Sequence, residues 1–175
     1  KKDIVKQLRE KMEAASDRLD FETAALLRDQ IQAIERVAAG QKVVMDADTE
    51  MDIIALAGTT RAVCAAVLRY RDGRLTDKRE FMFHDTTDID AVREEFLPQY
   101  YLNGETVPKT IAVDALPPDA EALNEALAQA RGTKVELYVP QRGDVAKLVT
   151  MAYTNAVERL GRESGRYTRE QKLLE

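Results

Sequence analysis

Several acidic side chains of this sequence are of the type that holds magnesium in phosphodiester hydrolysis, where clustered carboxylates bind two Mg²⁺ ions about 4 Å apart. Asp114 directly follows the apolar run Ile111-Ala112-Val113, and Glu94 and Glu95 stand earlier, in a segment with helical spacing. Such a site also needs an aspartate inside the first strand, but the middle of that segment reads Ala55-Leu56-Ala57. The carboxylates therefore lack one metal anchor.

Asp52 is the acidic residue nearest to the missing position. Because it stands at the edge of the apolar run, we expect its carboxylate to face solvent. Asp114 is then better interpreted as a turn former before Leu116-Pro117-Pro118. We predict that the chain has no catalytic residue, no metal ligands and no cofactor. A magnesium-dependent nuclease built on Asp114 and neighbouring acids is the alternative.

The sequence has one cysteine, Cys64, and one histidine, His84. A single cysteine excludes an internal disulfide and a thiolate cluster, and one histidine adds little to a zinc site, which needs several such ligands. Cys64 lies between Val63 and Ala65 in an apolar stretch. We therefore predict a buried structural thiol.

Charge is distributed unevenly along the chain. Residues 41–158 carry thirteen basic and twenty acidic side chains, whereas 159–175 carry five and three. The acidic central part repels phosphates and is a poor candidate for binding duplex DNA alone. Four later arginines would line one face of a helix that ran through Gly161 and Gly165, although a solvated linker is favoured because each glycine weakens a helix by about 1 kcal/mol. These candidate DNA contacts are Arg159, Arg162, Arg166 and Arg169.

Residues 1–39 have the periodicity of two amphipathic helices. Apolar residues recur at spacings of 3 and 4 from Ile4 to Leu19, and again from Ala24 to Ala38. The short connection permits only an antiparallel hairpin. Because fewer than about 40 residues rarely bury enough apolar surface to fold alone, the hairpin must pack on the rest of this chain, on another copy or on a different protein.

After residue 40 the apolar period changes from 3.6 towards 2. The resulting order of elements, β-β-β-α-β-α-β-α over residues 42–160, is that of the ribonuclease-H-like fold, in which helices cover a mixed sheet. We therefore predict an α+β or α/β protein with a hairpin at 1–39, this central domain, and a linker helix at 161–175. Strands are expected at 53–57, 62–68, 78–83, 110–113 and 134–139, and helices at 90–102, 119–131 and 143–160.

The stretch L-D-F-E-T-A-A-L-L-R-D-Q-I at 19–31 resembles the UVR motif, a helical hairpin found near the C-terminus of UvrB and in the middle of UvrC proteins. Leu8 and Met12 upstream, and Ala33-Ile34 downstream, agree with the motif. Nearly the whole chain resembles the UvrC family. The matching segments after the hairpin are Gln41-Lys42-Val43-Val44, 52–68, 96–101 and 140–144.

This resemblance implies a role in bacterial nucleotide excision repair, where the hairpin pairs with that of UvrB and recruits the nuclease to the UvrB–DNA complex. Neither a G-I-Y…Y-I-G pair nor a D-I-S-H-T-like motif occurs, so we expect a non-enzymatic fragment that binds UvrB and acts as a scaffold. Phe21, at the predicted tip, should matter most. The predicted UvrB contacts are Leu19, Phe21, Ala24, Leu27, Arg28 and Ile31.

Other interpretations remain open. An unrelated stress-response adaptor can carry such a hairpin, although those usually have cysteine-rich metal sites. The hairpin of the isolated fragment can also self-associate. No apolar run is long enough for a membrane span and no secretion signal occurs, so we expect a cytoplasmic protein that contacts DNA weakly or indirectly and no membrane.

Overall fold

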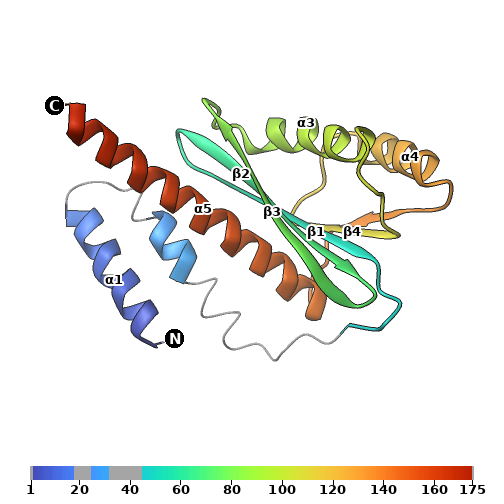
Figure 1. Ribbon diagram of the computed structural model, residues 1–175, viewed down its shortest axis with the longest axis horizontal. Coiled ribbons are helices and arrows are strands. Elements are labelled where there is room, and N and C mark those ends of the chain that lie inside the picture. Colours follow the sequence, from blue (N-terminus) through green and yellow to red (C-terminus); the bar gives the residue numbers. More distant parts are fainter. Residues whose placement is uncertain (1, 18–24, 32–44, 175) are drawn as a thin grey trace.

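The computed structural model describes residues 2–17, 25–31 and 45–174, with side chains described for 4–13, 25–31 and 45–165. A five-stranded sheet in the order β3-β2-β1-β4-β5 forms its centre (Figure 1). The strands are β1 (Met51–Gly58), β2 (Ala62–Arg71), β3 (Arg74–His84), β4 (Thr110–Val113) and β5 (Glu136–Tyr138). The helices are α1 (Lys2–Asp17), α3 (Ile89–Leu102), α4 (Ala120–Arg131) and α5 (Asp144–Leu174), and residues 25–31 are also helical.

The sheet is mixed, as predicted. Strands β1, β2 and β3 form an antiparallel meander, and β4 and β5 run parallel to β1. Parallel neighbours need crossover connections, which α3 and α4 supply. The predicted order of strands and helices in the central domain is therefore confirmed.

The turn between β2 and β3 depends on two residues with positive φ. Asp72 has φ 54° and Gly73 has φ 75°, the left-handed pair that a two-residue hairpin turn requires. A Cβ on Gly73 would also collide with the backbone carbonyl of Asp46. The Asp-Gly pair thus starts the edge strand β3 at a defined register.

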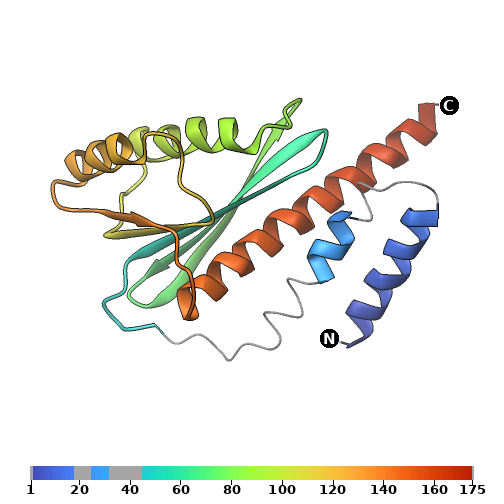
Figure 2. The same ribbon diagram turned by 180° about the vertical axis from the view of Figure 1, so that it is seen from behind.

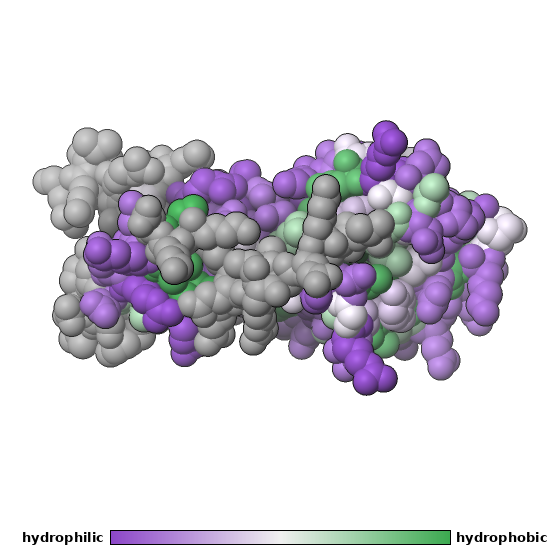
Figure 3. Space-filling model, turned by 90° about the horizontal axis from the view of Figure 1, so that it is seen from below, coloured by the Kyte–Doolittle hydropathy of each residue, from purple (hydrophilic) through white to green (hydrophobic). Residues whose placement is uncertain are grey.

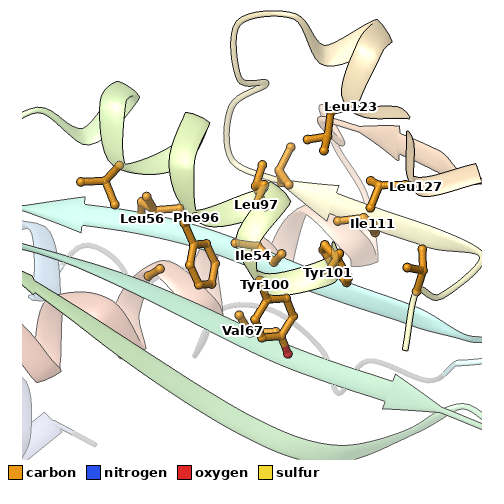
Figure 4. Close-up of a cluster of buried hydrophobic side chains, with 14 of the residues drawn as sticks. Ile54, Leu56, Val67, Phe96, Leu97, Tyr100, Tyr101, Ile111, Leu123 and Leu127 are labelled. Atoms are coloured by element: carbon orange, nitrogen blue, oxygen red, sulfur yellow. The ribbon is translucent and has the colours of Figure 1, made fainter. Parts of the chain in front are cut away.

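One hydrophobic core lies between the sheet and the helices α3 and α4 (Figure 4). Alternate residues of β1, such as Ile54 and Leu56, point into it and meet Phe96 and Leu97 from α3. The rings of Phe81, Phe83, Phe96, Tyr100 and Tyr101 form a chain of edge and tilted contacts there.

A second core lies between the opposite face of the sheet and α5, which packs mainly on β1 and β2. Ile53 and Leu68 from the strands meet Leu148 and Val157 from the helix. Cys64 also belongs to this core; it is buried, as predicted, and burial raises the pKa of its thiol to about 12. Because both faces of the sheet are covered, β1 and β2 are apolar almost throughout.

Helix α5 covers both the helix predicted at 143–160 and the linker helix predicted at 161–175. It continues without a break past Leu160, the last α5 residue in the core, and through Gly161 and Gly165 to Leu174. Figures 1 and 2 show this part of the helix extending past the edge of the sheet. Among the described residues, no helix is long and apolar enough to cross a membrane.

Candidate functional site

The carboxylate of Asp114 lies at the carboxyl end of β4, beside β1. Its Oδ2 accepts a hydrogen bond from the backbone N–H of Leu56 at 3.1 Å. The guanidinium of Arg93, on α3, donates to both carboxylate oxygens at 3.2 and 3.1 Å, and also to Asp90 at 2.9 Å. Arg93 is only 4% exposed. A fixed guanidinium therefore supplies the positive charge next to Asp114.

The chain bends at Asp114, as expected of a turn former, and its carboxylate in addition joins β1 to α3, which the sequence did not predict. Glu94 and Glu95, the other candidate ligands, are both exposed on α3. Among the residues that the structure describes, no three histidine, cysteine or acidic side chains stand close enough together to hold a metal ion.

The prediction that Asp52 faces solvent was also wrong. Asp52 is 1% exposed on β1, where its two oxygens accept hydrogen bonds from the hydroxyl of Tyr101 at 2.7 Å and from Arg71 at 2.9 Å. Burial raises the pKa of Asp52, against the opposing effects of Tyr101 and Arg71. Burial and the nearby carboxylate likewise raise the pKa of Tyr101 well above its usual value. This network ties β1 and β2 to α3.

The N-terminal helices form a separate layer. In Figures 1 and 2 the helical segment 25–31 lies between α5 and α1. Leu8 and Ile31 are buried, 8% and 4% exposed, yet belong to neither core of the central domain. Because segment 25–31 lies between α1 and α5 in both views, we infer that Leu8 and Ile31 lie where α1 faces this segment.

A different side of segment 25–31 contacts the central domain. Leu26 packs against the core beneath α5, to which Val149 and Tyr153 also contribute. The hydroxyl of Tyr153 donates a long hydrogen bond, 3.4 Å, to the carboxylate of Asp29. Among the described residues, the hairpin therefore contacts α5 and the core beneath it through Leu26 and Asp29. Figure 3 views the molecule from below; among the residues it colours, hydrophobic ones appear as small separate areas on a largely hydrophilic surface.

The residues predicted to contact UvrB differ in how far they are buried. Leu27 is half-buried, Arg28 is exposed and pairs with Asp29, and Ile31 is buried. The remaining three, which include the predicted tip residue, lie outside the described residues. They are Leu19, Phe21 and Ala24.

Two of the candidate DNA-contacting arginines have an acidic partner. Arg159 and Arg162 both approach Glu80 of β3, at 3.6 and 3.3 Å, and Arg159 also approaches Glu163 at 3.4 Å. These pairs fasten α5 to the edge strand. Arg166 belongs to the helix, as does Arg169, but their side chains are beyond those that the structure describes.

Sequence reasoning missed the residues that carry these contacts. Arg93 and Tyr101 act on partners 21 and 49 positions away, and periodicity gives no indication of such pairs. One signal was available for the hairpin: Leu26 stands beside Leu27, so the second helix has an apolar residue on each of two sides.

Comparison with known proteins accounts for both parts of the chain. Residues 50–163 match the family model of the UvrC ribonuclease H-like domain, and residues 2–37 match that of the UvrB/uvrC motif. The chain belongs to the UvrC family. The predicted ribonuclease-H-like fold and UVR hairpin are thereby confirmed.

Curated UvrC relatives align with nearly the whole chain. UvrABC system protein C of Thermoanaerobacter sp. (strain X514) is 38% identical over 159 residues, which cover 90% of this chain and 26% of that protein. The protein of the same name from Caldanaerobacter subterraneus subsp. tengcongensis is 36% identical over 162 residues, covering 91% and 26%. The chain thus spans about a quarter of the length of the UvrC proteins it matches.

Among solved structures, a Bacteroides thetaiotaomicron protein with an actin-like ATPase fold and unknown function is similar to 71% of this chain and 42% of its own. The TM-score is 0.32 and the sequence identity 9%. So distant a likeness has no bearing on the function of this UvrC segment.

Proposed function

We propose that this UvrC segment is a non-enzymatic binding and scaffolding region in bacterial nucleotide excision repair: its hairpin binds UvrB and thereby brings the incision nuclease to the UvrB–DNA complex. The match of residues 2–37 to the UvrB/uvrC motif carries this proposal. A motif common to the two proteins fits pairing between like hairpins, in which amphipathic helices bury apolar faces against each other.

Substitution at the predicted hairpin tip tests the partner. Phe21→Ala should weaken binding to UvrB by about 2 kcal/mol or more, because a large aromatic side chain at a contact is a typical hot spot. Helical content, measured by circular dichroism, should change little. Binding is measured by isothermal titration calorimetry with the C-terminal segment of UvrB.

Leu75→Ala is a control, because Leu75 is a large apolar residue that is exposed on β3 of the central domain, outside the hairpin. Its affinity for UvrB should equal that of the wild type. Equal affinities for wild type and Phe21→Ala would remove the tip from the proposed interface.

The non-enzymatic assignment is supported by the surroundings of the two aspartates. Asp114 is neutralised by Arg93, and both oxygens of Asp52 are occupied by Tyr101 and Arg71. Neither carboxylate has the open, uncompensated charge that a pair of Mg²⁺ ions needs. Purified protein should therefore not cut DNA in Mg²⁺; cleavage that disappears in Asp114→Asn would establish the nuclease alternative instead.

A further inference from the structure

The two sides of helical segment 25–31 are used differently. Leu26 and Asp29 are three residues apart and share one side, which faces α5. Leu27 and Ile31 are four apart and share another, about 150° away at 100° per residue. Ile31 is buried outside both cores of the central domain, so its side faces the interior of the hairpin.

A partner hairpin has two ways to reach an apolar side of this segment. Entering on the Leu27–Ile31 side requires separating the hairpin's own helices and exposing Leu8 and Ile31, both of which are nearly completely buried. Entering on the Leu26–Asp29 side requires release from α5, where the contact made by the described residues consists of a partly buried leucine and one long hydrogen bond. Among the described residues, the second way disturbs less buried surface.

We propose that the side of the hairpin carrying Leu26 and Asp29 is the side that binds a second hairpin of the same motif, and that α5 covers it through Tyr153 until the partner arrives. This inference rests on the proposed function and adds which side is used and what competes for it. The hairpin thus exchanges a contact within its own chain for an equivalent contact with its partner. Only the fraction of molecules with a released hairpin binds, which lowers the apparent affinity.

Substitutions on the two sides of the contact should have opposite effects. Tyr153→Ala weakens docking without altering the hairpin, so a synthetic UvrB C-terminal hairpin should bind about three- to tenfold more tightly. Leu26→Ala also weakens docking but removes a partner contact, so binding should become at least about tenfold weaker. If Leu26 contributed only to docking on α5, Leu26→Ala would instead tighten peptide binding, as Tyr153→Ala does.

Tyr153→Phe provides a milder variant that removes only the hydroxyl, and Tyr138→Phe is its matched control. Tyr138 is also a half-buried tyrosine packed against the α5-side core, but it lies on β5 and has no contact with Asp29. Tyr153→Phe should tighten binding of the hairpin peptide, although less than Tyr153→Ala does. Tyr138→Phe should leave the affinity unchanged.

Docking itself is measured in the absence of a partner by the distance between spin labels on Lys6→Cys and Arg142→Cys, two exposed positions. Native Cys64 is fully buried and does not compete for the label. Tyr153→Ala alone, or addition of the hairpin peptide to otherwise wild-type protein, should replace one narrow distance distribution by a broad one.

Each remaining outcome identifies which idea is wrong. Equal peptide affinity for wild type and Tyr153→Ala, or an unchanged label distance in the peptide complex, overturns the competition while leaving UvrB binding intact. Absence of peptide binding to every variant overturns the proposed function, and this inference with it, even where the label distance shows a docked hairpin.

Discussion

Arg93 is the residue on which the end of β4 depends. Its guanidinium is buried and holds Asp114, whose carboxylate also accepts from the backbone of β1. Removing one member of such a pair leaves an uncompensated charge in a poorly solvated place, which typically costs about 3–5 kcal/mol. Because Asp114 is partly exposed, its charge retains some solvation and the lower end of that range applies.

We therefore expect Arg93→Ala to lower the free energy of unfolding by about 3 kcal/mol, as measured by urea denaturation. Arg74→Ala is the control, because Arg74 is exposed at the start of β3 and should change stability by no more than about 0.5 kcal/mol. A similar small loss in Arg93→Ala would mean that the ion pair contributes nothing to folding.

Asp52 makes the stability of the folded protein depend on pH. Its folded-state pKa lies above the ordinary value of 3.8, mainly because of burial. Between those two pKa values the folded protein binds more protons than the unfolded chain, so the contribution of Asp52 to stability falls as pH rises through this window.

The Asp52→Asn variant lacks this titration. The difference in unfolding free energy, wild type minus variant, should therefore decrease between about pH 4 and the raised folded-state pKa of Asp52, as followed by urea denaturation at a series of pH values. A difference that grew with pH would show that the hydrogen bonds from Tyr101 and Arg71 outweigh burial.

Asp114 and Asp52 show which properties of a single residue the sequence can predict and which it cannot. The position of Asp114 after an apolar run correctly placed it at the end of β4. Its partner could not be predicted, since Arg93 reaches it only after α3 folds over the sheet. Asp52 was misjudged for the same reason: Tyr101, which makes its burial tolerable, arrives from α3 and not from a neighbour in the chain.

At the scale of elements, periodicity predicted the strands and helices of the central domain well, because each buries a regular set of apolar positions. It did not predict that the helix expected at 143–160 and the linker helix expected at 161–175 form one continuous helix, α5. Local propensity disfavours two glycines in a helix, but contacts of Arg159 and Arg162 with Glu80, together with packing through Leu160, favour the helical conformation up to Gly161.

The glycines of α5 offer a stabilising substitution. Gly161 and Gly165 are exposed, have no positive φ, and a Cβ on either would meet no atom within 4 Å. Gly165→Ala should raise the free energy of unfolding by about 0.5–1 kcal/mol, because alanine restricts the unfolded chain and favours the helix.

Gly132→Ala is the matched comparison, measured in the same urea titrations. A Cβ there also meets no atom, but Gly132 ends α4 with φ 89°, which strains any other residue. We expect this variant to be destabilised. The opposite order of the two variants would indicate that surface packing, rather than backbone conformation, decides the effect.

For the whole molecule, the balance of acidic and basic side chains differs between the central part and the C-terminal segment. Residues 41–158 carry an excess of acidic side chains, whereas 159–175 carry an excess of basic ones. Arg159 and Arg162 are already engaged with Glu80, so any affinity for DNA should be weak. Deleting residues 163–175 should change binding to duplex DNA by less than about threefold at low salt, as measured by fluorescence anisotropy.

A large, salt-dependent loss in the deletion would instead assign phosphate contacts to the later arginines, Arg166 and Arg169. Arg142→Ala serves as the control, because it removes an exposed arginine at the opposite end of α5 without changing the helix.

The part of α5 that follows Leu160 sets an angular relation between the sheet and any polypeptide fused after Leu174. From Gly161 onward the helix adds about 1.5 Å and 100° per residue. Two inserted residues would swing the fused unit about 200° around the helix axis, to the other flank of the molecule, while seven would return it to within about 20° of its bearing and move it outward by about 10 Å. The direction of the fused unit therefore repeats about every seven inserted residues, whereas its distance from the sheet grows with every inserted residue.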